Sequence, residues 1–200
     1  AVMEFEFLKL LADTHDKVSF ASVGSNHCRY RRGKTNLGRP IDDWGIFIAK
    51  QIKHRLDDNP DRFGHVKTYV PAPNDESLTV DLAGLRVGLA HGHQSSNPDR
   101  VPDWWAKQTH GGQPVWSADL LVTGHFHHFR VQPTGMHPIH RRSKWWIQAP
   151  TADAGSDWFR LAQGSDSEPS MLVFRVDQSG WHDLTLLRSV PAEAGELSSE

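Results

Sequence analysis

Three short apolar segments, each ending in a polar corner, constrain the fold of this chain more than any other feature. The segments cover residues 18–23, 85–90 and 120–122, and they lead into Gly24-Ser25-Asn26-His27, His91-Gly92-His93 and Gly124-His125-Phe126-His127. Short apolar runs bounded by glycine and polar residues are typical of buried strands. In an open α/β sheet, residues that follow neighbouring strands converge on one crevice. The sequence therefore predicts an α/β fold with a polar site at one edge of a sheet.

The histidines of the third corner indicate metal chemistry. Side chains alternate along a strand, so we expect His125 and His127 to share one side and His128 to point away. Gly124 would let the backbone turn between the strand and these residues. Imidazole is the commonest side-chain ligand of transition metals. A chance cluster of surface histidines is the alternative, but the presence of two further polar corners favours a metal site.

Composition limits the remaining possibilities. The chain has 200 residues, enough for one domain. Its formal charge of −2 argues against a polybasic tail as the main contact with nucleic acid. The single cysteine, Cys28, excludes an intrachain disulfide and fits a reducing compartment. There is neither a signal sequence nor an apolar run near the roughly 20 residues that span a bilayer, so we expect a cytoplasmic protein without a membrane partner.

Hydrophobic periodicity predicts a single layered α/β domain over residues 1–189. The predicted helices cover residues 1–15, 40–56 and 103–108, and the predicted strands cover residues 17–23, 65–70, 78–82, 85–90, 119–123, 129–132, 144–148, 171–177 and 183–188. The small-residue-rich, acidic segment 190–200 is expected to be a disordered tail. Because Ala1 rather than an initiator Met opens directly into a helical pattern, we expect the chain to be a fragment.

The order of the three corners resembles the downstream motifs of the calcineurin-like metallophosphoesterases. Over about residues 15–150, it looks most like the DNA-repair-exonuclease type found in actinobacteria and their phages. The resemblance implies a four-layer αββα sandwich with two divalent metal ions at one edge. Ser25 and Cys28 depart from the family pattern, and the upstream Asp-x-His and Gly-Asp-x-x-Asp motifs are absent, because Asp13-Thr14-His15 lies too close to His27. We therefore expect the C-terminal portion of such a domain, without its N-terminal strands.

The resemblance also implies roles for individual residues. Asn26, His91 and His125 would bind one metal ion, His127 would bind the other, and His27 would stabilise or protonate the departing oxygen. The implied reaction is hydrolysis of a phosphoester, most plausibly a phosphodiester such as DNA, by water activated at a dinuclear site. The family favours Mn²⁺, although His and Asn ligands also accept Zn²⁺, Fe²⁺ or Ni²⁺.

Residues near the corners are candidates for contacts with substrate. A basic loop follows the first corner and could hold phosphates or simply be solvated; its cations are Arg29, Arg31, Arg32 and Lys34. His93 lies beyond the glycine of its corner and is a candidate for substrate binding more than for metal binding. The pairs Trp104-Trp105 and Trp145-Trp146 could stack on bases, but core packing is the better explanation for one member of each pair.

The sequence also bears on two other functional classes. A non-catalytic module that binds metal or nucleic acid is the main alternative, because the acidic upstream motifs are missing. A metallo-β-lactamase-type hydrolase would need Asp-His after His91-Gly92-His93, and Gln94-Ser95 stands there instead. Asp153 and Asp157 follow all three corners and are candidates for the rim of the site rather than replacements for the missing carboxylates.

Overall fold

The chain folds as a mixed α/β protein in the computed structural model, which describes residues 2–33, 35–139, 141–153, 161 and 168–188. The helices are α1 (Val2–Thr14), α2 (Trp44–Asp57), α3 (Pro60–Phe63) and α4 (Val101–His110), with a short 3-10 helix, η1 (Pro98–Arg100). The strands are β1 (Val18–Ala21), β2 (Arg31–Arg32), β3 (Thr35–Asn36), β4 (Val66–Tyr69), β5 (Ser77–Leu82), β6 (Leu85–Ala90), β7 (Leu120–Thr123), β8 (Arg130–Met136), β9 (Ser143–Gln148), β10 (Ser170–Asp177) and β11 (Gly180–Arg188).

A five-stranded mixed sheet forms the centre of the molecule. Its strand order is β5-β6-β7-β9-β8, with β6, β7 and β9 parallel and the two outer strands antiparallel to their neighbours. One face packs against α4 through a buried cluster that includes Trp105, Leu121 and Trp146. The other face packs against the β10–β11 hairpin, where Leu172 and Phe174 contact the cluster of buried strand residues. Both faces of the central strands are therefore covered, as their continuous apolar runs require.

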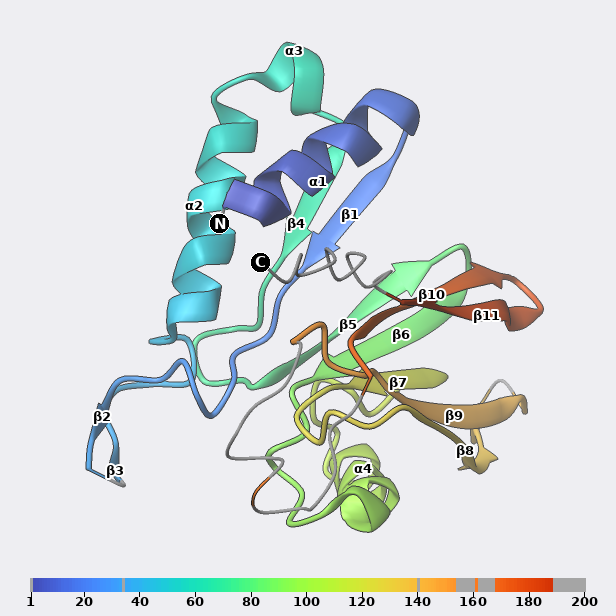
Figure 1. The fold of residues 1–200 in the computed structure, drawn as a ribbon. Coiled ribbons are helices and arrows are strands. Elements are labelled where there is room, and N and C mark those ends of the chain that lie inside the picture. Colours follow the sequence, from blue (N-terminus) through green and yellow to red (C-terminus); the bar gives the residue numbers. More distant parts are fainter. Residues whose placement is uncertain (1, 34, 140, 154–160, 162–167, 189–200) are drawn as a thin grey trace, which may run out of the picture.

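The N-terminal part of the chain builds a second core. β1 and β4 pair in parallel, and helices α1, α2 and α3 pack with them around Leu8, Val18, Ile52 and Phe63. Asp43 starts α2, because its side chain accepts hydrogen bonds from the backbone N–H groups of Gly45 and Ile46. The short β2–β3 hairpin follows β1 in the chain and precedes α2, and it projects away from the other elements (Figure 1).

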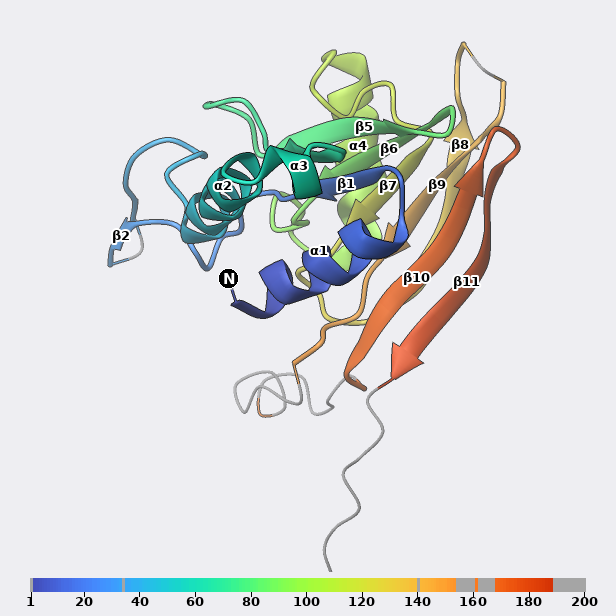
Figure 2. The ribbon, with the colours of Figure 1, turned by 90° about the horizontal axis from the view of Figure 1, so that it is seen from above.

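The elements are arranged in layers. Seen from above, α1 and α4 lie on opposite sides of the strands, with the β1–β4 pair and the five-stranded sheet between them (Figure 2). The predicted α/β class is confirmed. The predicted acidic tail, residues 190–200, lies outside the described residues.

Most predicted elements are confirmed, and the differences have local causes. β8 extends to Met136, beyond the predicted end at residue 132. It is an edge strand that shifts register between Pro133 and Gly135, and a proline is tolerated at such a place. Helix α2 starts at Trp44 and not at Pro40, because Asp43 caps it. The hairpin β2–β3 and the one-turn helix α3 were not predicted, since two and four residues show no periodicity.

Candidate functional site

The carboxyl ends of β1, β6 and β7 meet, as the three polar corners predict. β6 and β7 are parallel neighbours, and the backbone N–H of Gly124 after β7 donates to the carbonyl of His91 after β6 at 3.0 Å. Asn26 comes from the loop after β1, in the other sheet. Its Oδ1 lies 3.0 Å from Nε2 of His91. The site therefore joins the two sheets through one side-chain contact.

Four imidazole rings surround this contact. The ring centroids of His91 and His125 are 5.0 Å apart, and His27 lies 6.5 Å from His91 and 6.4 Å from His125. His93 completes the group, 5.4 Å from His91 and 6.2 Å from His125. We call Asn26, His27, His91, His93 and His125 the histidine cluster. Sequence analysis had named all five.

The backbone presents His125 and His127 differently from the prediction. β7 ends at Thr123, so neither residue is part of a strand, and the argument from side-chain alternation is wrong. Both residues have left-handed backbones, with φ of 69° and 63°. The N–H of Phe126 donates to the carbonyl of Gly124 at 2.8 Å, which closes a γ-turn around His125. Such a conformation costs about 1–3 kcal/mol for a residue other than glycine, and it often occurs at functional sites.

Packing around the turn holds this strained backbone in place. Phe126 is partly buried against the cluster of Trp105, Leu121 and Trp146. Gly92 faces the turn from the next corner with φ of 110°. A Cβ on Gly92 would lie 3.2 Å from the carbonyl oxygen of Gly124 and 3.3 Å from Cβ of His125. The second corner therefore needs glycine both for its backbone angle and for this close approach.

The environment keeps the central rings neutral. Burial, together with the neighbouring histidines, lowers the pKa of His91 to about 3. Burial also lowers the pKa of His125 to about 4. The pKa of His127 is lowered mainly by burial, although Asp153 opposes that shift. Neutral imidazole is the form that binds a metal ion, so these rings are prepared for coordination at ordinary pH.

Glu76 is a member of the site that sequence analysis missed. Its carboxylate lies 3.5 Å from Nε2 of His93, accepts from the Gln94 side chain at 3.1 Å and pairs with Arg29 at 2.9 Å. Its contact with His93 lowers the pKa of Glu76 to about 2, against the effect of burial. The signal was present in the β5–β6 hairpin: since Ser77 pairs with Ala90, the preceding residue, Glu76, comes level with His91.

A buried carboxylate positions the Asn26–His27 corner. Oδ2 of Asp43 accepts from the N–H of Ser25 at 3.1 Å, while its Oδ1 caps α2 through Gly45 and Ile46. The Ser25 hydroxyl in turn accepts from the N–H groups of His27 and Cys28 at 3.2 and 3.1 Å. Asp43 is only 2% exposed. The inserted serine is therefore built into the corner, and one carboxylate links the corner to the start of α2.

The other predicted contact residues have varied surroundings. Arg29 has a side chain that is 13% exposed and is engaged by Glu76, whereas Arg31 and Arg32 are exposed on β2. Lys34 lies outside the described residues. His15 precedes β1 whereas Asn26 follows it, so Asp13-Thr14-His15 lies at the opposite end of that strand from the cluster. The structure thus keeps the apparent Asp-x-His motif apart from the site.

The tryptophan pairs belong largely to the core. Trp105 is 1% exposed and Trp146 is fully buried. The indole N–H of Trp105 donates to the carbonyl of Val115, and that of Trp146 donates to the hydroxyl of Thr123. Trp104 packs partly buried against the same cluster, and Trp145 packs edge-on against Trp181. The prediction that one member of each pair packs in the core is confirmed.

The donor atoms of the cluster fit part of a metal site. Ligand atoms about 2 Å from one ion are about 3 Å from one another, and Asn26 Oδ1 and His91 Nε2 are 3.0 Å apart. Nδ1 of His125 is buried without a hydrogen-bond partner among the described residues. No three His, Cys, Asp or Glu side chains within the described part of the chain are grouped closely enough to hold an ion. The cluster is therefore a partial ligand set, with the Asn26 amide as one donor.

Comparisons with known proteins give only distant likenesses. The sequence matches no protein-family model and no curated protein. A double mutant of Vps29 from Entamoeba histolytica is 15% identical, with 92% of this chain and 89% of that one covered and a TM-score of 0.45. Wild-type Vps29 of the same organism, complexed with Zn²⁺, is 12% identical over 86% of this chain and 97% of its own, with a TM-score of 0.39.

A third likeness is to a conserved protein of Streptococcus pneumoniae that is described as a predicted phosphoesterase. It is 13% identical, with 86% of this chain and 87% of that one covered and a TM-score of 0.39. Identities and TM-scores this low leave the function to be argued from the residues of the chain itself. As for membranes, no helix among the described residues is long and apolar enough to cross one.

Proposed function

We propose that this chain carries part of the active site of a metal-dependent phosphodiester hydrolase. The observation that carries the proposal is the contact between Asn26 and His91, with His125 beside it, at the carboxyl ends of three strands. The order of the motifs, which resembles that of the calcineurin-like metallophosphoesterases, supports it. The substrate class follows from that resemblance, and DNA is our first candidate.

Three members of the histidine cluster, together with His127, would hold the metal ions. Asn26, His91 and His125 would bind one divalent ion, and His127 would contribute to a second. When bound, such ions supply Lewis acidity, which polarises phosphate oxygens and makes a water molecule more acidic. Mn²⁺ is the ion that we expect, and Zn²⁺, Fe²⁺ or Ni²⁺ would also suit these donors. Because Asn26 and the low-pKa rings of His91 and His125 are neutral, they leave the charge of an ion uncompensated, which favours an anionic phosphate.

His27 is the candidate proton donor. Its ring lies against His91 and His125 but belongs to a different corner, and its backbone N–H is held by the Ser25 hydroxyl. This position would let the His27 ring face a phosphate bound at the cluster and give a proton to the departing oxygen. A correctly placed general acid contributes about 10²–10⁴ in rate. Glu76 orients His93 at the edge of the cluster, where His93 would contact a phosphate oxygen.

The test is hydrolysis of bis(p-nitrophenyl) phosphate in the presence of Mn²⁺. We expect activity that requires metal and that is lost in His125→Ala, because that variant removes a ligand. His110→Ala is the matched control, since His110 ends α4 and lies outside the three corners. Unchanged turnover in His125→Ala would refute the assignment.

A non-catalytic metal- or nucleic-acid-binding module is the second candidate. The partial ligand set favours it, since the described residues hold no group of three His, Cys, Asp or Glu side chains at metal-binding distance. It predicts metal or nucleic-acid binding that is lost in His125→Ala, with no turnover of any diester. Both candidates therefore predict metal binding that depends on His125, but only the first predicts turnover of a diester.

A further inference from the structure

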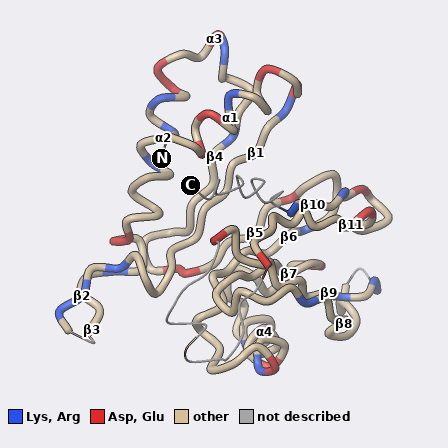
Figure 3. The backbone as a smooth tube through the Cα atoms, in the orientation of Figure 1, with Lys and Arg blue, Asp and Glu red and all other residues tan. Residues whose placement is uncertain are grey.

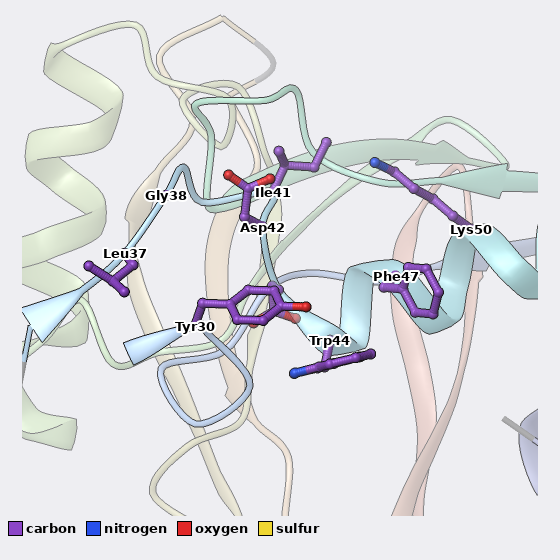
Figure 4. Close-up of a pocket in the computed structure, with 9 residues that line it drawn as sticks. Tyr30, Leu37, Gly38, Ile41, Asp42, Trp44, Phe47 and Lys50 are labelled. Atoms are coloured by element: carbon purple, nitrogen blue, oxygen red, sulfur yellow. The ribbon is translucent and has the colours of Figure 1, made fainter. Parts of the chain in front are cut away.

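An exposed aromatic hollow lies beside the Asn26–His27 corner and takes no part in the metal site. It has a volume of about 570 Å³ and lies between the β2–β3 hairpin and the start of α2 (Figure 4). We define the aromatic hollow by the side chains of Tyr30, Leu37, Trp44, Phe47 and Lys50. The first four are apolar or aromatic and are 51%, 47%, 50% and 50% exposed. Large apolar side chains grouped at a surface in this way mark binding sites.

The rings form a fixed surface with Trp44 at its centre. The centroids of Tyr30 and Trp44 are 5.6 Å apart with an interplanar angle of 39°, and those of Trp44 and Phe47 are 5.5 Å apart at 86°. Backbone hydrogen bonds hold both sides of the hollow: the N–H of Trp44 donates to the Cys28 carbonyl at 3.0 Å, and that of Leu37 donates to the Tyr30 carbonyl at 2.7 Å. The backbone segments that carry the rings of Tyr30 and Trp44 are therefore held in place.

Positive charge borders the hollow. Lys50 lines it, and Arg31 and Arg32 are exposed on β2 of the adjoining hairpin. Figure 3 shows positions of basic residues on that hairpin. No carboxylate of the described residues pairs with these three cations. The two acids at the hollow are already engaged, because Asp42 accepts from the N–H of Arg39 and the buried Asp43 caps α2. Aromatic faces bordered by unpaired cations suit a polyanion with flat rings better than an apolar peptide or a second copy of this chain.

The hollow lies within reach of the histidine cluster. Tyr30 follows His27 by three residues, so their Cα atoms are at most about 11 Å apart. Asp43 also connects the two places, because it accepts from Ser25 of the corner and caps the helix that begins at Trp44. A phosphate at the cluster and a neighbouring base on Trp44 can therefore belong to the same strand.

We infer that the aromatic hollow binds a nucleobase of single-stranded nucleic acid, by stacking on Trp44 and Tyr30, while an adjacent phosphate lies at the histidine cluster. The placement of the phosphate at the histidine cluster rests on the proposed function, whereas the placement of the base rests on the aromatic hollow alone. Stacking on an aromatic side chain contributes about 1–3 kcal/mol per base, with little dependence on sequence.

The experiment measures binding without turnover. Fluorescence anisotropy in EDTA compares a labelled oligothymidylate of about 10 nucleotides with an abasic oligomer of the same length and charge. Trp44→Ala should weaken oligothymidylate binding about 5- to 150-fold, which corresponds to the loss of one stacked base, and should leave abasic binding unchanged. Trp44→Phe should retain most of the affinity. Trp116→Ala, at an exposed tryptophan before the amino end of β7, is the matched control and should bind as the wild type does.

Several outcomes would overturn the inference. Equal weakening for both oligomers would mean that the hollow recognises only charge, and no weakening would mean that it binds no base. A dimer that dissociates in Trp44→Ala, with oligomer binding unchanged, would identify a second copy as the occupant. If Trp44→Ala fails to fold, Tyr30→Ala carries the same expectation. Base-dependent binding without any diester hydrolysis would refute the proposed function and leave this inference standing.

Discussion

Removal of the Asp43 carboxylate should destabilise the chain and the site together. Asp43 accepts three backbone hydrogen bonds, two from the first turn of α2 and one from Ser25. An N-cap contributes about 1 kcal/mol, and a bond from a buried N–H to a charged acceptor contributes about 1.5–3 kcal/mol. We therefore expect Asp43→Ala to lower the free energy of unfolding by about 3 kcal/mol, which for a chain of this size lowers Tm by about 6–12 °C.

Asp43→Asn separates the two roles of this residue. Asparagine caps helices as well as aspartate does, so its oxygen should retain the bonds from Gly45 and Ile46. Its amide group would replace Oδ2 and could not accept from Ser25. We expect a loss of about 2 kcal/mol in unfolding free energy and metal binding weakened about 10- to 100-fold, as when support behind a ligand is removed.

The control is Asp42→Ala. Asp42 is the partly exposed neighbour and accepts one loop hydrogen bond, from the N–H of Arg39 at 2.8 Å, so its replacement should cost less than about 1 kcal/mol. Urea unfolding followed by far-UV circular dichroism measures all three variants. If Asp43→Asn unfolds and binds metal as the wild type does, Asp43 is only a helix cap and the argument for the corner is refuted.

Three further predictions concern the cluster and its support. Gly92→Ala should lower the unfolding free energy by about 2–4 kcal/mol, through positive-φ strain and contact with His125. Its control is Gly112→Ala, which should cost about 1 kcal/mol because Gly112 has a φ of 64° and a Cβ there would have no neighbour within 4 Å. Equal losses would contradict the close approach of Gly92 to the turn at His125. In EDTA, the free energy of unfolding should fall as the pH is lowered from about 6.5 toward 4, because the unfolded chain protonates His91 and His125 while the folded chain does not. His91→Gln should reduce that loss by about 1 kcal/mol between pH 6.5 and 5. An unchanged loss would show that His91 is not held neutral. Glu76→Gln should cost about 1–3 kcal/mol in urea unfolding, because Arg29 loses its partner; Asp99→Asn, which removes the exposed partner of Arg130, should cost less than about 1 kcal/mol and is its control.

Strand periodicity predicted the framework of the site well. The runs that became β5, β6 and β7 are apolar, short and bounded by turn residues, and their observed bounds lie within one residue of those predicted. Because β6 and β7 are parallel, their carboxyl ends bring His91 and His125 together as expected. The approach of Asn26 to His91 likewise agrees with the order of the corners.

The features that the sequence did not reveal depend on contacts between distant residues or on special backbone angles. A period of two residues cannot foretell that His125 has a left-handed backbone inside a γ-turn. Glu76 was not predicted because only the register of the β5–β6 hairpin brings it level with His91. The exposure of Trp44 beside Tyr30 depends on a hairpin of two-residue strands, which is too short to show a pattern. The ion pair between Arg29 and Glu76 likewise joins residues far apart in the chain, so the sequence did not predict it.

The central claim is that Asn26, His91 and His125 bind a divalent ion. Isothermal titration with Mn²⁺ and with Zn²⁺, on the wild type and on His91→Ala, His125→Ala and His15→Ala, tests it most directly. We predict a site that is lost in the first two variants and retained in His15→Ala, because His15 lies at the other end of β1 from Asn26. Binding that survives His91→Ala and His125→Ala, or that disappears in His15→Ala, would contradict the account.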